Sequence, residues 1–188
     1  MKEIWNESCI LSPSLICLDM CNLEREVKTL EKAGIKMLHV DILDGHFSPS
    51  MPLGLDTVRQ LRAKTDMFFD CHVMVTEQDY FVDELLDIGV DQIVFHGETQ
   101  PHIDGMLNRI HAKGVKAGVA LKPATPLSEL EYVLDKCDTV LLMLINPGYA
   151  FVKGEKQVTY ADRKIRELRK MITDRGLKTK IEVDGRIS

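Results

Sequence analysis

The sequence predicts an α/β fold of the (β/α)₈ barrel type, and three observations support this. Short apolar runs alternate with polar amphipathic segments along the 188 residues. A glycine followed by an aliphatic residue recurs at four junctions between such segments. In three of the apolar runs, polar residues occupy alternate positions and so share one face. Strict alternation of helices and strands implies parallel pairing with right-handed crossovers.

The four glycines predict where helices end, because glycine just past a helix adopts the left-handed conformation at little cost. They are Gly34, Gly89, Gly114 and Gly176. Apolar residues at helical spacing predict the helices themselves, and Asn22 and Thr125-Pro126 are typical of helix starts. The apolar sets are Leu23, Val27 and Leu30; Phe81, Leu85 and Ile88; and Ile165, Leu168 and Ile172.

Seven apolar runs are predicted to be strands. No G-x-G-x-x-G follows the first of them, which disfavours a dinucleotide-binding open sheet. An open sheet would also bury both faces of each strand and leave the shared polar face unexplained, whereas a barrel has an inner face that can hold a site. The predicted strands are Ile10–Ile16, Met37–Ile42, Met67–Val75, Gln92–His96, Lys116–Leu121, Val140–Ile145 and Lys180–Asp184.

The given sequence ends at Ser188, directly after the seventh predicted strand. We therefore expect a single barrel domain over residues 1–188 whose eighth βα unit is absent from this sequence. A barrel without that unit would have two unpaired strand edges. We expect the natural product to be longer.

Composition excludes several classes of partner. The formal net charge is −5, and no basic run is present, which argues against nucleic acid or an anionic membrane. Five scattered cysteines without a CxxC pair indicate free thiols in a reducing compartment. Pro13 and Asp19 interrupt the apolar N-terminal stretch, so no signal peptide is predicted, and no stretch is long enough to span a bilayer. A cytoplasmic protein is expected.

Four polar residues lie late in predicted strands and on one face: His39, Asp41, His72 and Asp184. In (β/α)₈ enzymes the chemistry lies at the carboxyl ends of the strands, so we expect these side chains to converge there. Two imidazoles and two carboxylates suit a divalent transition metal such as Zn²⁺. A single buried histidine or aspartate is more often hydrogen-bonded to a neighbour, but four at the same end of three strands favour a site.

Six segments in register resemble the ribulose-phosphate 3-epimerase family, from about Leu11 to Gly185. They are LSPSLICLD, HVDILDGHF, DCHVMV, ALKPATPLSELEYVL, MLINPG and IEVDG. The resemblance implies a metal-dependent isomerase of the pentose phosphate pathway that converts D-ribulose 5-phosphate to D-xylulose 5-phosphate through an enediolate. SLICLD, DCHVMVTEQDY and HGET are closer to the allulose-6-phosphate 3-epimerase branch, so that hexose phosphate is the alternative substrate.

The resemblance also implies roles for particular residues. The metal would be bound by His39, Asp41, His72 and Asp184, and Asp41 and Asp184 would also accept and donate the proton. Zn²⁺ is expected, with Fe²⁺, Mn²⁺ or Co²⁺ as alternatives. The expected partners are a phosphorylated ketose and further copies of the chain, as a homo-oligomer. The predicted substrate-binding residues are Ser12, His72, Met74, Met143, Gly148 and Gly185.

One loop departs from the family. After Gly148 the family continues with a phenylalanine and small glycine-rich residues, whereas this chain reads YAFVKGEKQVTY. The phosphate contacts of that loop are therefore not predicted by the resemblance. Two alternatives stay open: another metal-assisted reaction through an enediolate, such as aldol cleavage or decarboxylation, and a non-catalytic barrel that binds a sugar phosphate or a protein.

Overall fold

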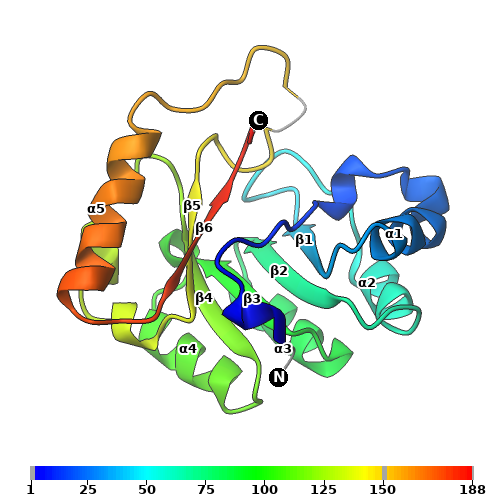
Figure 1. Ribbon diagram of the computed structural model, residues 1–188, viewed down its shortest axis with the longest axis horizontal. Coiled ribbons are helices and arrows are strands. Elements are labelled where there is room, and N and C mark those ends of the chain that lie inside the picture. Colours follow the sequence, from blue (N-terminus) through cyan, green and yellow to red (C-terminus); the bar gives the residue numbers. More distant parts are fainter. Residues whose placement is uncertain (1–2, 150–151, 188) are drawn as a thin grey trace.

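The computed structural model describes residues 3–149 and 152–187, and these contain a single six-stranded sheet with the order β1-β2-β3-β4-β5-β6. Every neighbouring pair is parallel, and the order in space equals the order in the chain. The sheet is curled, as Figure 1 shows. The strands are β1 Met37–Leu43, β2 Phe68–Met74, β3 Gln92–His96, β4 Lys116–Leu121, β5 Thr139–Met143 and β6 Lys180–Asp184.

The described residues form five α-helices, which lie around the outside of the curled sheet (Figure 1). All four predicted glycines follow helices in the left-handed region, with φ between +63° at Gly176 and +86° at Gly34, which confirms those predictions. Over the described residues, no helix combines the length and apolar character needed to cross a bilayer. The helices are α1 Leu23–Lys32, α2 Leu55–Arg62, α3 Gln78–Ile88, α4 Ile103–His111 and α5 Ala161–Asp174.

The first predicted strand, Ile10–Ile16, is wrong. Residues Leu15–Cys17 form a 3₁₀ turn, and Ser14 makes one isolated parallel bridge to His39. Pro13 has no N–H to offer a ladder, although its carbonyl oxygen accepts a hydrogen bond from the His39 amide at 3.0 Å. Asp184 therefore ends the sixth strand of the sheet rather than a seventh.

Two predicted helix starts also differ from the structure. Thr125-Pro126 leads into a 3₁₀ turn, Leu127–Leu130, because the connection between β4 and β5 contains short turns in place of an α-helix. Asn22 precedes α1, but its side chain donates to Asp19 Oδ2 at 2.7 Å and does not cap the helix. Of the departing loop, Ala150 and Phe151 lie outside the described residues, as does Ser188. The single-domain organisation stays a prediction.

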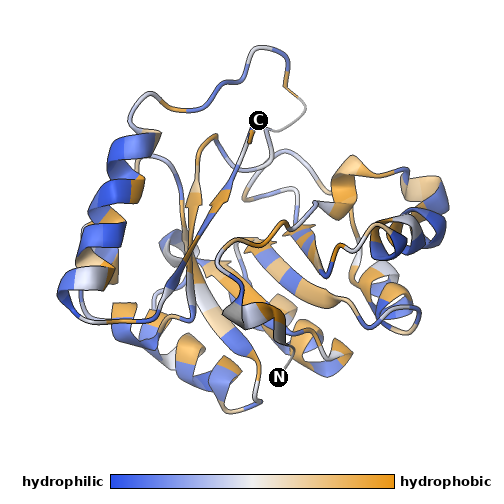
Figure 2. Ribbon diagram, in the orientation of Figure 1, coloured by the Kyte–Doolittle hydropathy of each residue, from blue (hydrophilic) through white to orange (hydrophobic). Residues whose placement is uncertain are grey.

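The two faces of the sheet bury different groups. On β2, Phe69, Cys71 and Val73 face the helices and belong to the main core, whereas Asp70 and His72 face inwards. The colours of Figure 2 show the alternation of hydrophobic and hydrophilic residues along the strands. A smaller apolar cluster on the inner side fills part of the barrel interior, and it consists of Val94, Ala120, Leu141 and Met143. Polar side chains, among them His39, Asp70 and Gln92, occupy other inner positions.

The loop after β1 is held by one carboxylate. Asp44 accepts hydrogen bonds from the amides of His46, Phe47 and Thr76 at 2.7–2.8 Å and from the Thr76 hydroxyl at 2.8 Å. Burial raises the pKa of Asp44, but the N–H groups of Thr76, Phe47 and His46 outweigh it and lower the pKa to about 2. Asp44 therefore ties the ends of β1 and β2 together at the rim of the barrel.

We expect Asp44→Asn to lower the free energy of unfolding by roughly 1–3 kcal/mol, since it weakens hydrogen bonds to a charged acceptor. The pKa of Asp44 is depressed by folding, so its contribution is complete above the ordinary value of 3.8 and is lost as the pH falls towards about 2. Urea unfolding at pH 7 and at pH 3 measures this. The exposed Asp66→Asn is the matched control, and equal stability of the two variants at pH 7 would contradict the prediction.

Candidate active site

The structure brings the four predicted ligands together at the carboxyl end of the barrel. His39 and Asp41 come from β1, His72 from β2 and Asp184 from the last position of β6. One ligand atom from each lies within 4.8 Å of the others. The parallel register aligns Asp41 with His72, and the curl of the sheet brings β6 opposite β1. The alternation of side chains along each strand is the reason that all four share the inner face.

Each of the two histidines turns one ring nitrogen towards the two carboxylates. Nε2 of His39 and Nδ1 of His72 are buried and unpartnered within the described part of the chain. His39 Nε2 lies 3.3 Å from Asp41 Oδ1 and 4.0 Å from Asp184 Oδ2, and His72 Nδ1 lies 3.5 and 3.9 Å from the same carboxylates. Buried polar atoms are rarely left unsatisfied, so the arrangement suits a group that binds between them.

A second layer of polar residues orients His39. Its Nδ1 lies 3.0 Å from Asp70 Oδ2 and 3.2 Å from Glu182 Oε1. Asp70 in turn accepts from the Gln92 amide at 2.6 Å, and Gln92 accepts from the Thr139 hydroxyl at 3.0 Å. This series of hydrogen bonds crosses the barrel interior from β1 to β5. It fixes the ring of His39 with Nε2 turned towards the cluster.

The buried charges shift each other's protonation. Burial lowers the pKa of His39, but Asp41 and its other acidic neighbours outweigh it and raise the pKa well above its usual value. Burial raises the pKa of Asp41, but His39 and His72 lower it well below the usual range. Burial and then the charge of Asp70 raise the pKa of Glu182 to about 8. The acidic neighbours of His39 therefore favour a positively charged group among these side chains.

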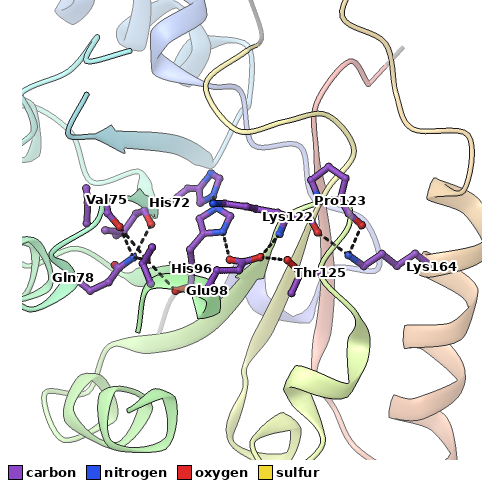
Figure 3. Close-up of polar contacts among 11 residues, drawn as sticks. His72, Val75, Gln78, His96, Glu98, Lys122, Pro123, Thr125 and Lys164 are labelled. Atoms are coloured by element: carbon purple, nitrogen blue, oxygen red, sulfur yellow. Dashed lines mark hydrogen bonds and ion pairs between the residues drawn. The ribbon is translucent and has the colours of Figure 1, made fainter. Parts of the chain in front are cut away.

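His72 is oriented by a different series of hydrogen bonds, which Figure 3 shows. Its Nε2 lies 3.0 Å from Nε2 of His96, whose Nδ1 lies 2.8 Å from Glu98 Oε2. Burial lowers the pKa of His96 to about 4, although Glu98 opposes this. Burial raises the pKa of Glu98, but the hydrogen bond with His96 and those with Thr125 and Lys122 outweigh it and hold the pKa at about 2. At neutral pH the pair is a neutral imidazole and a carboxylate.

The other predicted site residues occupy varied places. Met74 and Met143 are buried, and Met143 pairs in register with Asp184 and belongs to the inner apolar cluster. The Ser12 hydroxyl is buried and has no partner among the described residues. Ser14 was not among the predicted site residues, but its hydroxyl donates to Asp41 Oδ2. The Ser-x-Ser spacing in LSPS was the available signal, but the sequence does not show which hydroxyl meets Asp41.

Gly148 and Gly185 follow β5 and β6 in conformations that favour glycine, with φ of +80° and +110°. A Cβ at Gly148 would lie 1.6 Å from Ser48 Oγ, and one at Gly185 would lie 2.7 Å from Ile145 Cγ1. Close packing between loops is therefore sufficient to require glycine at both positions. Their expected contact with substrate stays a prediction.

A curled parallel sheet with a polar cluster at the carboxyl ends of its strands is typical of (β/α)-barrel enzymes. Solved structures agree with this fold. 7,8-Dihydropteroate synthase from Vibrio fischeri ES114 matches with a TM-score of 0.54 at 15% identity, over 94% of this chain and 74% of that one. The alpha subunit of tryptophan synthase from Campylobacter jejuni matches with 0.52 at 14% identity, over 92% and 84%. At such identities the likeness concerns the fold alone.

Sequence comparison identifies the family. The ribulose-phosphate 3 epimerase family matches residues 10–188. The chloroplastic ribulose-5-phosphate-3-epimerase of Arabidopsis thaliana is 40% identical over 95% of this chain, which spans 63% of that protein. The ribulose-phosphate 3-epimerase of Bacillus subtilis is 37% identical over 95% of this chain and 81% of its own length. The chain belongs to the ribulose-phosphate 3-epimerase family, a family of isomerases, which confirms the resemblance.

We expect Gly148→Ala to destabilise the rim of the site, because the new methyl would collide with Ser48 and the residue would keep a positive φ. The expected cost is about 1–3 kcal/mol in the free energy of unfolding. Adding Ser48→Gly removes the colliding atoms and should restore part of the loss. Thermal and urea unfolding measure both variants, and a double variant no more stable than Gly148→Ala would contradict the packing explanation.

Proposed function

We propose that this chain is a metal-dependent epimerase that interconverts D-ribulose 5-phosphate and D-xylulose 5-phosphate at C3. The observation that carries the proposal is the convergence of Asp41 and Asp184 with two imidazole nitrogens that have no hydrogen-bond partner among residues 3–149 and 152–187. The family supports the reaction type, and the relatives named above act on ribulose phosphate by their names.

The four side chains fit a divalent cation by the kind of atoms they offer. Nε2 of His39 and Nδ1 of His72 can each present a lone pair, and Asp41 and Asp184 are carboxylates. Nitrogen and oxygen donors in such a set suit Zn²⁺, and also Fe²⁺, Mn²⁺ or Co²⁺. When bound, such an ion supplies positive charge that stabilises the negative charge on the substrate oxygens after the C3 proton has left.

The two carboxylates account for inversion. Removal of the proton beside the ketone leaves a planar enediolate, and inversion requires a new proton from the opposite face. Asp41 comes from β1 and Asp184 from β6, so the two can face such an intermediate from different strands. One removes the proton, and the other delivers a proton, with the roles exchanged in the reverse direction. The Ser14 hydroxyl, which donates to Asp41, helps to orient the base.

We propose ribulose 5-phosphate as the substrate in place of allulose 6-phosphate, because the named relatives are ribulose-phosphate epimerases. Turnover of both ketose phosphates under the same conditions distinguishes them, with the pentose phosphate expected to give the higher kcat/KM. The expected homo-oligomer also stays a prediction, and sedimentation tests it.

Metal binding has a readout that does not depend on activity. A cation that binds only the folded chain stabilises it, by about 2.7 kcal/mol at a free concentration one hundred times its Kd. We expect Zn²⁺ to raise the Tm of the metal-free protein and EDTA to reverse the rise. His72→Ala should abolish the shift, whereas the exposed His102→Gln should keep it. A Zn²⁺-dependent shift of equal size in His72→Ala would contradict the site.

Exchange with solvent tests the proton transfer itself. We expect Asp41→Asn and Asp184→Asn each to slow epimerisation by roughly 10²–10⁴-fold. In deuterated water each variant should still exchange the C3 proton of one epimer without converting it to the other, because one carboxylate remains. Nuclear magnetic resonance of each epimer measures the exchange. If both epimers still exchange in either variant, the two-carboxylate mechanism is excluded. If neither epimer exchanges in the unmodified protein, a non-catalytic barrel is favoured.

A further inference from the structure

The two ring nitrogens of His72 have different neighbours, and these neighbours determine which nitrogen carries the proton. Nδ1 faces Asp41 and Asp184 and has no hydrogen-bond partner among the residues described. Nε2 faces Nε2 of His96 at 3.0 Å. A hydrogen bond between two imidazole nitrogens holds one proton, so one ring donates and the other accepts. The direction of that bond decides whether His72 Nδ1 has a lone pair to offer.

Glu98 sets this direction from the far end of the chain shown in Figure 3. Its Oε1 accepts from the Lys122 amide at 2.6 Å and from the Thr125 hydroxyl at 2.5 Å, and its Oε2 lies 2.8 Å from His96 Nδ1. A carboxylate can only accept. His96 Nδ1 therefore carries the proton, Nε2 of the neutral His96 ring accepts, and His72 must donate from its own Nε2. His72 Nδ1 is then left with a lone pair facing the cluster.

The support for Glu98 reaches the outer layer of the barrel. The Lys164 ammonium, on α5, donates to the carbonyl oxygens of Lys122 and Pro123 at 2.8 and 2.9 Å, and Lys164 is only 9% exposed. These contacts hold the loop after β4, whose Lys122 amide and Thr125 hydroxyl bind Glu98. Both groups donate to Oε1 of Glu98, which leaves Oε2 to accept from His96.

We propose that Glu98, acting through His96, is a positioning residue that fixes His72 as the Nε2–H tautomer and so presents Nδ1 as a ligand. The inference rests on the proposed metal-dependent function, for which His72 must offer a lone pair at that atom. His39, by contrast, presents Nε2 because Asp70 and Glu182 lie beside its Nδ1. The two histidines therefore use opposite nitrogens, and each choice is made by a different acidic neighbour.

Glu98→Gln should reverse the direction of the hydrogen bonds from residue 98 through His96 to His72, with little change in the shape of the side chain. Its amide oxygen stays with the two donors, Lys122 N–H and the Thr125 hydroxyl, and its NH₂ group turns to His96. His96 Nδ1 must then accept, its Nε2 donates to His72, and the proton of His72 moves to Nδ1. We expect two-bond ¹H–¹⁵N spectra of the metal-free protein at pH 7.5 to show this reversal, and calorimetry to show Zn²⁺ binding weakened about 10- to 100-fold.

Two variants serve as controls. Glu129→Gln removes the same charge from an exposed glutamate and should leave both measurements unchanged. Glu98→Asp keeps an obligate acceptor and should keep the tautomer of the unmodified protein. Circular dichroism confirms that each variant is folded, and the tautomer in the unmodified protein decides the inference even if Glu98→Gln does not fold.

The outcomes separate this inference from the proposed function. A proton on His72 Nδ1 in the unmodified protein, or a folded Glu98→Gln with unchanged tautomer and Zn²⁺ affinity, overturns the positioning role. Failure of the unmodified protein to bind Zn²⁺, Mn²⁺, Fe²⁺ or Co²⁺, with the expected tautomers present, overturns the metal site and leaves the proton chain intact.

Discussion

The structure depends on the balance of charge inside the barrel. Three imidazoles and several carboxylates are removed from water on the inner face, and each would cost several kcal/mol if it were buried alone. They are tolerated because they lie against one another and are held by a second layer of amides, hydroxyls and acids. Asp70 and Glu182 face one histidine, and His96 faces the other. Within the described residues, the same arrangement leaves His39 Nε2 and His72 Nδ1 without a hydrogen-bond partner, as the proposed metal site requires.

The outer layer takes part in this balance. Lys164 on α5 holds the loop after β4, that loop holds Glu98, and Glu98 orients the rings that lead to the inner cluster. Asp44 holds the loop after β1 through the amides of His46 and Phe47 and joins it to Thr76, after β2. Phe47, in that loop, lies with its ring centroid 4.6 Å from that of His96, and the Lys122 ammonium lies 4.0 Å from the centroid of Phe47. Rim loops and site therefore form one connected unit.

The fold alone does not distinguish this chain from other barrels. Its fold is shared with enzymes of other names at about 15% identity, and what distinguishes the chain lies in a few inward positions at the strand ends. The inner apolar cluster of Val94, Ala120, Leu141 and Met143 fills the space beside the polar cluster. A packed interior of this kind holds the four clustered side chains in one geometry, which the proposed acid–base chemistry requires.

The sequence by itself determined the alternation of elements, the helix ends at glycine and the four residues that meet at the barrel mouth. These follow from local rules, namely left-handed glycine and the two-residue period of a strand. Only the tertiary structure decided that residues 10–16 form an isolated bridge and the start of a 3₁₀ turn in place of a strand, and that Ser14 is the serine that contacts Asp41. It also decided the partners of each ring, because the pattern of a strand shows which face a side chain occupies but not which atoms it meets across the barrel.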